Sequence, residues 1–183
     1  MNIAGVKYND IADGIGVRTT VFVSGCRRHC KGCHNPETWD FGYGRPFSSA
    51  LQDEIIASLR PSWIQGLTIC GGEPFEPENE EALIPFLQRV RSELPGKDIW
   101  IYTGFLREEL AGRALLRYVD VLVDGPFLID QKDAGLAFRG SRNQRIIRMG
   151  KNNESGYRKT DSASHYSSEI RRTERTAQSC GSL

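Results

Sequence analysis

Three cysteines stand close together in the first fifth of the chain, at Cys26, Cys30 and Cys33. They follow a stretch, 19–25, that predicts a β-strand, so one turn after that strand carries all three thiols. Three thiolates can bind a metal but leave one tetrahedral position unfilled, whereas a structural zinc site recruits a fourth protein ligand. Soft sulfur ligands select zinc or iron–sulfur clusters rather than magnesium or calcium. The spacing therefore predicts a metal centre with an open position for a substrate or cofactor.

Two other interpretations of these cysteines exist. A disulfide framework is disfavoured, because five cysteines is an odd number and the chain opens without the apolar core of a secretion signal. A closed zinc knuckle is the more serious alternative, since His29 or His34 could complete a tetrahedron beside the thiols. Composition does not distinguish a zinc site from an iron–sulfur site, so the distinction must come from the residues around the cysteines.

The cysteine spacing Cys-x-x-x-Cys-x-x-Cys resembles the cluster-binding motif of the radical S-adenosylmethionine (SAM) enzymes. Four further stretches narrow the resemblance, at 13–18, 70–75, 120–127 and 139–145. Together they resemble the activating enzymes of glycyl-radical enzymes, in the branch that acts on anaerobic ribonucleotide reductase. The resemblance runs from about the first residue to about Met149.

The resemblance implies two cofactors and the residues that hold them. Cys26, Cys30 and Cys33 would bind three irons of a [4Fe-4S] cluster, and the fourth iron would chelate the amine and carboxylate of SAM. The Gly-Gly-Glu stretch would bind the ammonium, through backbone carbonyls and the Glu73 side chain. The residues expected along SAM are Gly32, Cys33, His34, Gly71, Gly72, Glu73 and Thr103.

The implied reaction is a radical activation. An external one-electron donor such as flavodoxin would reduce the cluster, and electron transfer would cleave a carbon–sulfur bond of SAM. The 5′-deoxyadenosyl radical would then take hydrogen from a glycine of the reductase large subunit, leaving a glycyl radical. The cofactors supply this chemistry, so no catalytic acid or base of the protein is expected beyond the cluster and SAM.

Three charged residues could belong to a substrate-binding loop at the mouth of the site. The resemblance places the stretch containing Asp13 and Arg18 there, although Ile15 stands where the family has Pro. Asp124 begins a later loop at the same predicted rim. The alternative for Asp13 and Arg18 is a plain glycine turn with Arg18 in a salt bridge.

Strand and helix patterns alternate along the chain and predict an α/β fold with a mostly parallel sheet. By resemblance this is an open, incomplete TIM-like (βα) barrel of the radical SAM type. The Gly-Gly-Glu stretch follows a buried strand, at the rim where such sheets bind ligands. Strands are expected at 3–8, 19–25, 66–70, 98–102, 119–123 and 145–149, and helices at 48–60, 78–93 and 107–117. Pro85 should either kink the second helix or move its start to about Ile84.

Composition predicts one domain, 1–149, followed by a polar tail, 150–183, that is too poor in apolar residues to offset its ordering entropy. The net charge of +1 gives no argument for nucleic-acid binding. No apolar stretch approaches the roughly twenty residues that cross a bilayer. Free cysteines without an export signal indicate the reducing cytoplasm.

Other functions stay open at this point. The partner could be another glycyl-radical enzyme, such as pyruvate formate-lyase. From a different class, the chain could be a zinc-stabilised binding module whose cysteines only fix a loop. Sequence alone does not give the electron donor, the cluster potential, the affinity for SAM, the oligomeric state or the role of the tail.

Overall fold

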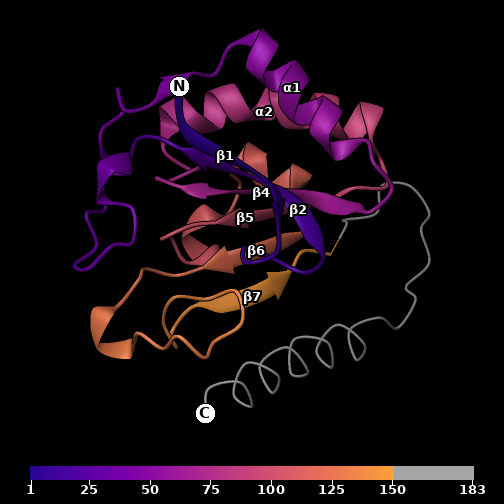
Figure 1. Cartoon of the computed structure of the whole chain (residues 1–183). Coiled ribbons are helices and arrows are strands. Elements are labelled where there is room, and N and C mark those ends of the chain that lie inside the picture. Colours follow the sequence, from indigo (N-terminus) through magenta and orange to yellow (C-terminus); the bar gives the residue numbers. More distant parts are fainter. Residues whose placement is uncertain (151–183) are drawn as a thin grey trace.

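The computed structural model describes residues 1–150, so the predicted disorder of the tail falls on residues outside the described range, Gly150 excepted. The described chain forms a mixed α/β structure around one sheet of seven strands, in the order β3-β1-β2-β4-β5-β6-β7 (Figure 1). The strands are β1 (Asn2–Asp10), β2 (Val17–Val23), β3 (Arg45–Pro46), β4 (Ile64–Gly71), β5 (Asp98–Tyr102), β6 (Val121–Asp124) and β7 (Arg145–Arg148).

The middle of the sheet is parallel and its margins are antiparallel. Strands β2, β4, β5 and β6 run in one direction, whereas β1, β3 and β7 pair antiparallel with their neighbours. The parallel prediction thus holds only for the central strands. The sheet is open, with β3 and β7 at its two edges. The carboxyl ends of the four central strands therefore meet at one edge, where open α/β sheets bind ligands.

The helices are α1 (Ser49–Leu59) and α2 (Pro77–Glu93), with 3-10 turns η1 (Pro36–Trp39), η2 (Arg107–Leu110), η3 (Ala114–Tyr118) and η4 (Ile129–Gln131). Ser48 caps α1, its hydroxyl accepting the Leu51 N–H at 3.3 Å. The single helix predicted over 107–117 is wrong: Gly112, with φ +82°, separates η2 from η3. No helix within residues 1–150 is long and apolar enough to span a membrane.

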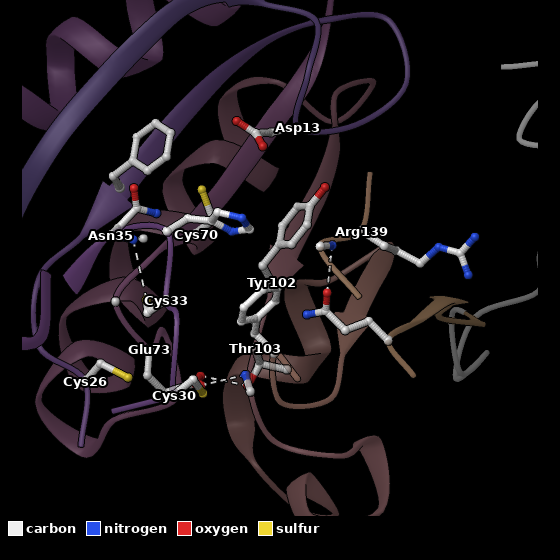
Figure 2. Close-up of a pocket in the computed structure, with 18 of the residues that line it drawn as sticks. Asp13, Cys26, Cys30, Cys33, Asn35, Cys70, Glu73, Tyr102, Thr103 and Arg139 are labelled. Atoms are coloured by element: carbon white, nitrogen blue, oxygen red, sulfur yellow. Dashed lines mark hydrogen bonds between the residues drawn. The ribbon is translucent and has the colours of Figure 1, made fainter. Parts of the chain in front are cut away.

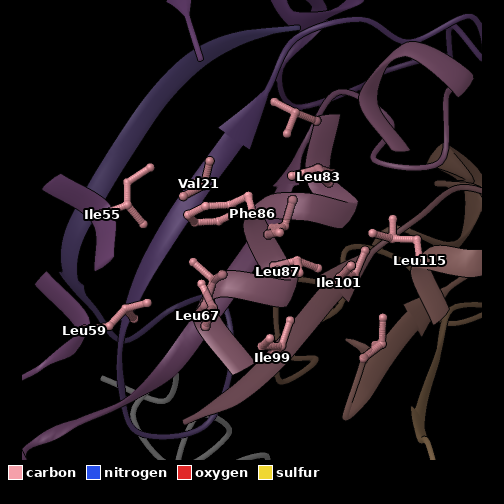
Figure 3. Close-up of a cluster of buried hydrophobic side chains, with 14 of the residues drawn as sticks. Val21, Ile55, Leu59, Leu67, Leu83, Phe86, Leu87, Ile99, Ile101 and Leu115 are labelled. Atoms are coloured by element: carbon pink, nitrogen blue, oxygen red, sulfur yellow. The ribbon is translucent and has the colours of Figure 1, made fainter. Parts of the chain in front are cut away.

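The main core lies between the sheet and the two helices α1 and α2, which cover the same face (Figures 1 and 3). Side chains alternate between the two faces of the sheet along β5. Ile99 and Ile101 belong to this core, while Trp100 points to the opposite face. There Trp100 packs in a smaller cluster with Val121 and Val123, against which the loop residues Ile15 and Phe138 also pack. The loop-covered face leaves room for a cavity beside this cluster.

Candidate functional site

A cavity of about 660 Å³ opens at the carboxyl ends of the central strands (Figure 2). This volume lies within the range of roughly 300–1,000 Å³ that ligand pockets occupy. The structure brings most of the predicted site residues to its walls, although they come from four separate segments. These residues are Asp13, Cys26, Cys30, Cys33, His34, Gly71, Gly72, Glu73 and Thr103.

The segment that carries the three cysteines is held by backbone hydrogen bonds to η1. The Gly25 N–H donates to the Thr38 carbonyl at 2.7 Å, and the Cys26 N–H donates to the Trp39 carbonyl at 3.2 Å. The His29 ring stacks on the Trp39 ring, with centroids 4.5 Å apart. These contacts fix where the cysteine loop leaves β2.

The three thiols are free and half-buried. The Asn35 N–H donates to the Cys33 sulfur at 3.4 Å, a bond that a thiolate would strengthen (Figure 2). Burial raises the pKa of the Cys26 thiol to about 11, with the Glu73 charge adding to the effect. A bound metal reverses this, because it deprotonates a coordinating thiol.

The chemistry of the three thiols bears on the kind of metal centre that they could hold. Within residues 1–150, no group of three or more Cys, His, Asp or Glu side chains converges closely enough to hold one metal ion. A single zinc would require sulfurs roughly 3.8 Å apart, given its bond length of about 2.3 Å. A four-iron cube places each thiolate on a different iron and spreads the sulfurs further. Cysteine thiolates are the donors that iron–sulfur clusters use, and three of them line one cavity here.

Gly71 and Gly72 are required by the close approach of two chain segments. A Cβ on Gly72 would lie 2.6 Å from the Gly25 carbonyl oxygen, and one on Gly71 would lie 2.8 Å from the Val23 carbonyl oxygen. Gly71 also has φ +96°, a conformation that favours glycine. The pair therefore lets the end of β4 pack directly against the start of the cysteine loop.

Two hydrogen bonds close that contact between β4 and the cysteine loop. The Gly72 N–H donates to the Val23 carbonyl at 2.7 Å, and the Glu73 N–H donates to the Gly25 carbonyl at 2.9 Å. The fully buried Asn79 amide donates to the carbonyls of Ser24, at 3.0 Å, and Glu73, at 2.9 Å. The cysteine loop and the Gly-Gly-Glu stretch thus form one hydrogen-bonded unit.

Glu73 is buried beneath this unit. Its carboxylate accepts from the Thr103 hydroxyl at 2.7 Å, the Gly104 N–H at 2.8 Å and the Phe75 N–H at 3.0 Å (Figure 2). Burial raises the pKa of Glu73, and these three hydrogen bonds oppose the rise. Glu73 therefore ties the rim loop of β4 to the rim loop of β5.

A second carboxyl group faces the other end of the cavity. Burial and the neighbouring Asp10 carboxylate raise the pKa of Asp13 to about 7. Burial opposes ionisation of Asp10 as well, but hydrogen bonds from Asp13 and Thr20 help to lower its pKa to about 2. Figure 2 shows the Tyr102 side chain directed toward Asp13, and its buried hydroxyl has no hydrogen-bond partner within residues 1–150.

Three predicted site residues do not line the cavity. Arg18 is fully buried and pairs with Asp98 at 2.6 Å, which matches the salt-bridge alternative for this residue. Asp124 is fully buried, accepts the Arg107 N–H at 2.7 Å and pairs with Arg145. Gly32 has φ +75° and packs toward η4.

Several cavity residues were missed from the sequence, although period-two alternation could have found some. Phe22, Cys70 and Tyr102 stand next to the carboxyl ends of β2, β4 and β5, on the face opposite to the helix-covered core. Cys70 is buried in β4 and lines the cavity. Arg28, inside the cysteine loop, was missed because a single charged residue in a loop has no periodicity or motif spacing that would predict a role in the site.

The fold and the cysteine-lined cavity define an iron–sulfur protein: residues 12–147 match the family described as "4Fe-4S single cluster domain". A protein of Haemophilus influenzae is 47% identical over 153 residues, covering 81% of this chain and 99% of the relative. One of Vibrio cholerae is 47% identical, covering 76% and 93%, and one of phage T4 is 38% identical, covering 80% and 93%. All three are named anaerobic ribonucleoside-triphosphate reductase-activating protein. The chain belongs to this family of activating proteins.

Proposed function

We propose that this protein is a radical SAM activase that cleaves SAM reductively and generates a glycyl radical on the large subunit of anaerobic ribonucleotide reductase. The observation that carries the proposal is the shared cavity of Cys26, Cys30 and Cys33 with the Gly-Gly-Glu stretch. The names of the relatives support the reductase as the partner and disfavour pyruvate formate-lyase. The iron–sulfur family match disfavours the zinc-stabilised module.

In this proposal Cys26, Cys30 and Cys33 hold a [4Fe-4S] cluster with one iron open to SAM. When bound, the cluster supplies the single electron that cleaves SAM, whose adenosyl fragment takes hydrogen from the glycine. The Asn35 N–H stabilises the Cys33 thiolate. The hydrogen-bonded unit of the cysteine loop and the Gly-Gly-Glu stretch keeps these thiols at one wall.

The remaining SAM contacts follow from the cavity walls. Gly71 and Gly72 present backbone to the cavity, and Glu73 and Thr103 fix the two rim loops against each other. His34 packs on the Phe127 ring, with centroids 4.9 Å apart, and this aromatic wall excludes water from a reactive intermediate. Gly32 supports this arrangement through the backbone of the cysteine loop.

The glycine-bearing segment of the reductase would enter beside Asp13, which lines the cavity. Arg18 and Asp124 lie behind that surface, so they act in this proposal by positioning the loops that the segment meets. An open sheet of the incomplete TIM-like type leaves a side accessible to a large protein substrate. Residues 1–149 would form this catalytic domain, working in the cytoplasm with an electron donor such as flavodoxin.

Anaerobic reconstitution with iron and sulfide tests the proposal. After reduction with dithionite, we expect a cubane electron paramagnetic resonance signal that changes when SAM is added, and we expect 5′-deoxyadenosine as a product. Incubation with the reductase should then give a glycyl-radical signal, and incubation with pyruvate formate-lyase should not. An electron paramagnetic resonance signal that does not change when SAM is added would contradict the proposal.

A further inference from the structure

We propose that Arg28 binds the carboxylate of SAM, as a positioning residue in the cysteine loop. The inference rests on the proposed function, because it requires that SAM enters the cavity. It adds a residue that the cysteine motif leaves unspecified.

Arg28 stands between Cys26 and Cys30 and lines the same cavity as both thiols. It also lines a second groove on the outer side of the loop, together with Cys30. Arg28 therefore borders both hollows, beside two of the thiols that would hold the cluster.

The guanidinium of Arg28 has no hydrogen bond or ion pair within residues 1–150, and its buried Nε atom lacks an acceptor. Other arginines with little exposure are paired with carboxylates: Arg18 with Asp98 at 2.6 Å, and Arg91 with Asp120 at 2.5 Å. Burying a charged donor without a partner costs free energy. An anion supplied by a ligand would remove that cost.

Two neighbours hold the guanidinium in place without satisfying its donors. It lies over the Phe105 ring, with 4.5 Å between the guanidinium carbon and the ring centroid. A Cβ on Gly104 would lie 2.4 Å from the Cδ and Nε atoms of Arg28. The absence of a side chain at Gly104 therefore makes room for the Arg28 side chain. Aromatic stacking leaves the edge of the planar fork free for hydrogen bonding.

The buried Glu73 carboxylate does not take this role. Burial raises the pKa of Glu73. Its hydrogen bonds oppose that rise, and the positive charge of Arg28 opposes it to a smaller extent. Yet its oxygens accept from Thr103, Gly104 and Phe75, and Arg28 forms no ion pair with it. The fork stays available for an external carboxylate, which guanidinium binds in bidentate fashion.

Binding of SAM and of decarboxylated SAM to the cluster-loaded protein tests the assignment. For Arg28→Gln we expect the Kd for SAM to rise on the order of tenfold or more, because a charge-assisted bond is lost. The Kd for decarboxylated SAM should stay within about twofold, since that ligand has nothing for the guanidinium to bind. Arg28→Lys keeps the charge without the fork and should show an intermediate, carboxylate-dependent loss.

Arg27→Gln is the matched control. Arg27 adjoins Arg28 but is exposed and pairs with Glu76 and Glu78, both at 2.5 Å. Its loss should leave both Kd values within about twofold, because Arg27 does not line the cavity that would bind SAM.

An equal rise for both ligands in Arg28→Gln, or no rise for either, would overturn the inference. If Arg28→Gln fails to retain iron and sulfide, the same comparison in Arg28→Lys decides, because that variant keeps the packing and the charge. Failure of the proposed function looks different: there the wild-type protein itself would bind neither ligand.

Discussion

The Thr103 hydroxyl donates a 2.7 Å hydrogen bond to the Glu73 carboxylate and so joins the rim loops that follow β4 and β5. Both residues are buried, and Thr103 also accepts the Phe105 N–H at 3.1 Å. The two residues are thirty positions apart in the sequence, but parallel strands bring the ends of β4 and β5 together. Together with the bond from the Gly104 N–H to Glu73, the Thr103 hydrogen bond holds the two rim loops together.

Thr103→Val should weaken this link between the two rim loops. The change keeps the shape of the side chain but leaves the buried Glu73 carboxylate with one donor fewer, which we expect to cost about 1–3 kcal/mol of unfolding free energy. Urea unfolding of the wild type and the variant measures the loss. Thr103→Ser retains the hydroxyl and should lose clearly less; equal losses for Val and Ser would show that the methyl group, rather than the bond, matters.

Cys30→Ala should abolish cluster-dependent SAM cleavage, because two thiolates do not hold the cube that the third completes. Cys70→Ala is the control, since Cys70 lines the same cavity but lies in β4, outside the cysteine loop. It should retain its iron and sulfide content and its yield of 5′-deoxyadenosine. Cleavage at the wild-type rate in Cys30→Ala would make the cluster assignment wrong.

Gly72→Ala should destabilise the protein by about 1–3 kcal/mol, the usual cost of forcing extra atoms into a packed site. The reason is the 2.6 Å approach of the new Cβ to the Gly25 carbonyl oxygen. Gly96→Ala serves as the control, because nothing lies within 4 Å of a Cβ at that position. The free energies of unfolding in urea should separate the two variants; similar values would contradict the packing argument.

The raised pKa of Asp13, about 7, predicts a dependence of stability on pH. The unfolded carboxyl releases its proton near pH 4, so between about pH 4 and pH 7 the folded state binds more protons than the unfolded state. Stability should therefore fall as pH rises through this window. The lowered pKa of Asp10 acts in the opposite sense, but only below the window.

Asp13→Asn should remove that decline, and anaerobic urea unfolding from about pH 5 to about pH 8 measures it. Histidine titration is common to both proteins, so it cancels in the comparison. An unchanged slope in Asp13→Asn would show that another group causes the pH dependence.

The sequence alone determined the features that are local. The cysteine spacing predicted the thiols that share the cavity, and apolar patterns predicted both α-helices and every strand except the two-residue β3, because periodicity is a property of neighbouring residues. It did not predict the break in 107–117, where Gly112 takes a positive φ, nor the antiparallel margins of the sheet. Those depend on backbone freedom and strand pairing.

The tertiary structure decided which residues meet. Arg18 and Asp124 looked like site residues but are buried in ion pairs behind the cavity. Arg28 looked like an ordinary loop residue, yet it is a guanidinium without an anion in residues 1–150. Burial and partner choice are set by segments far apart in the chain, which explains why residue type and spacing fixed the thiols but not the charges around them.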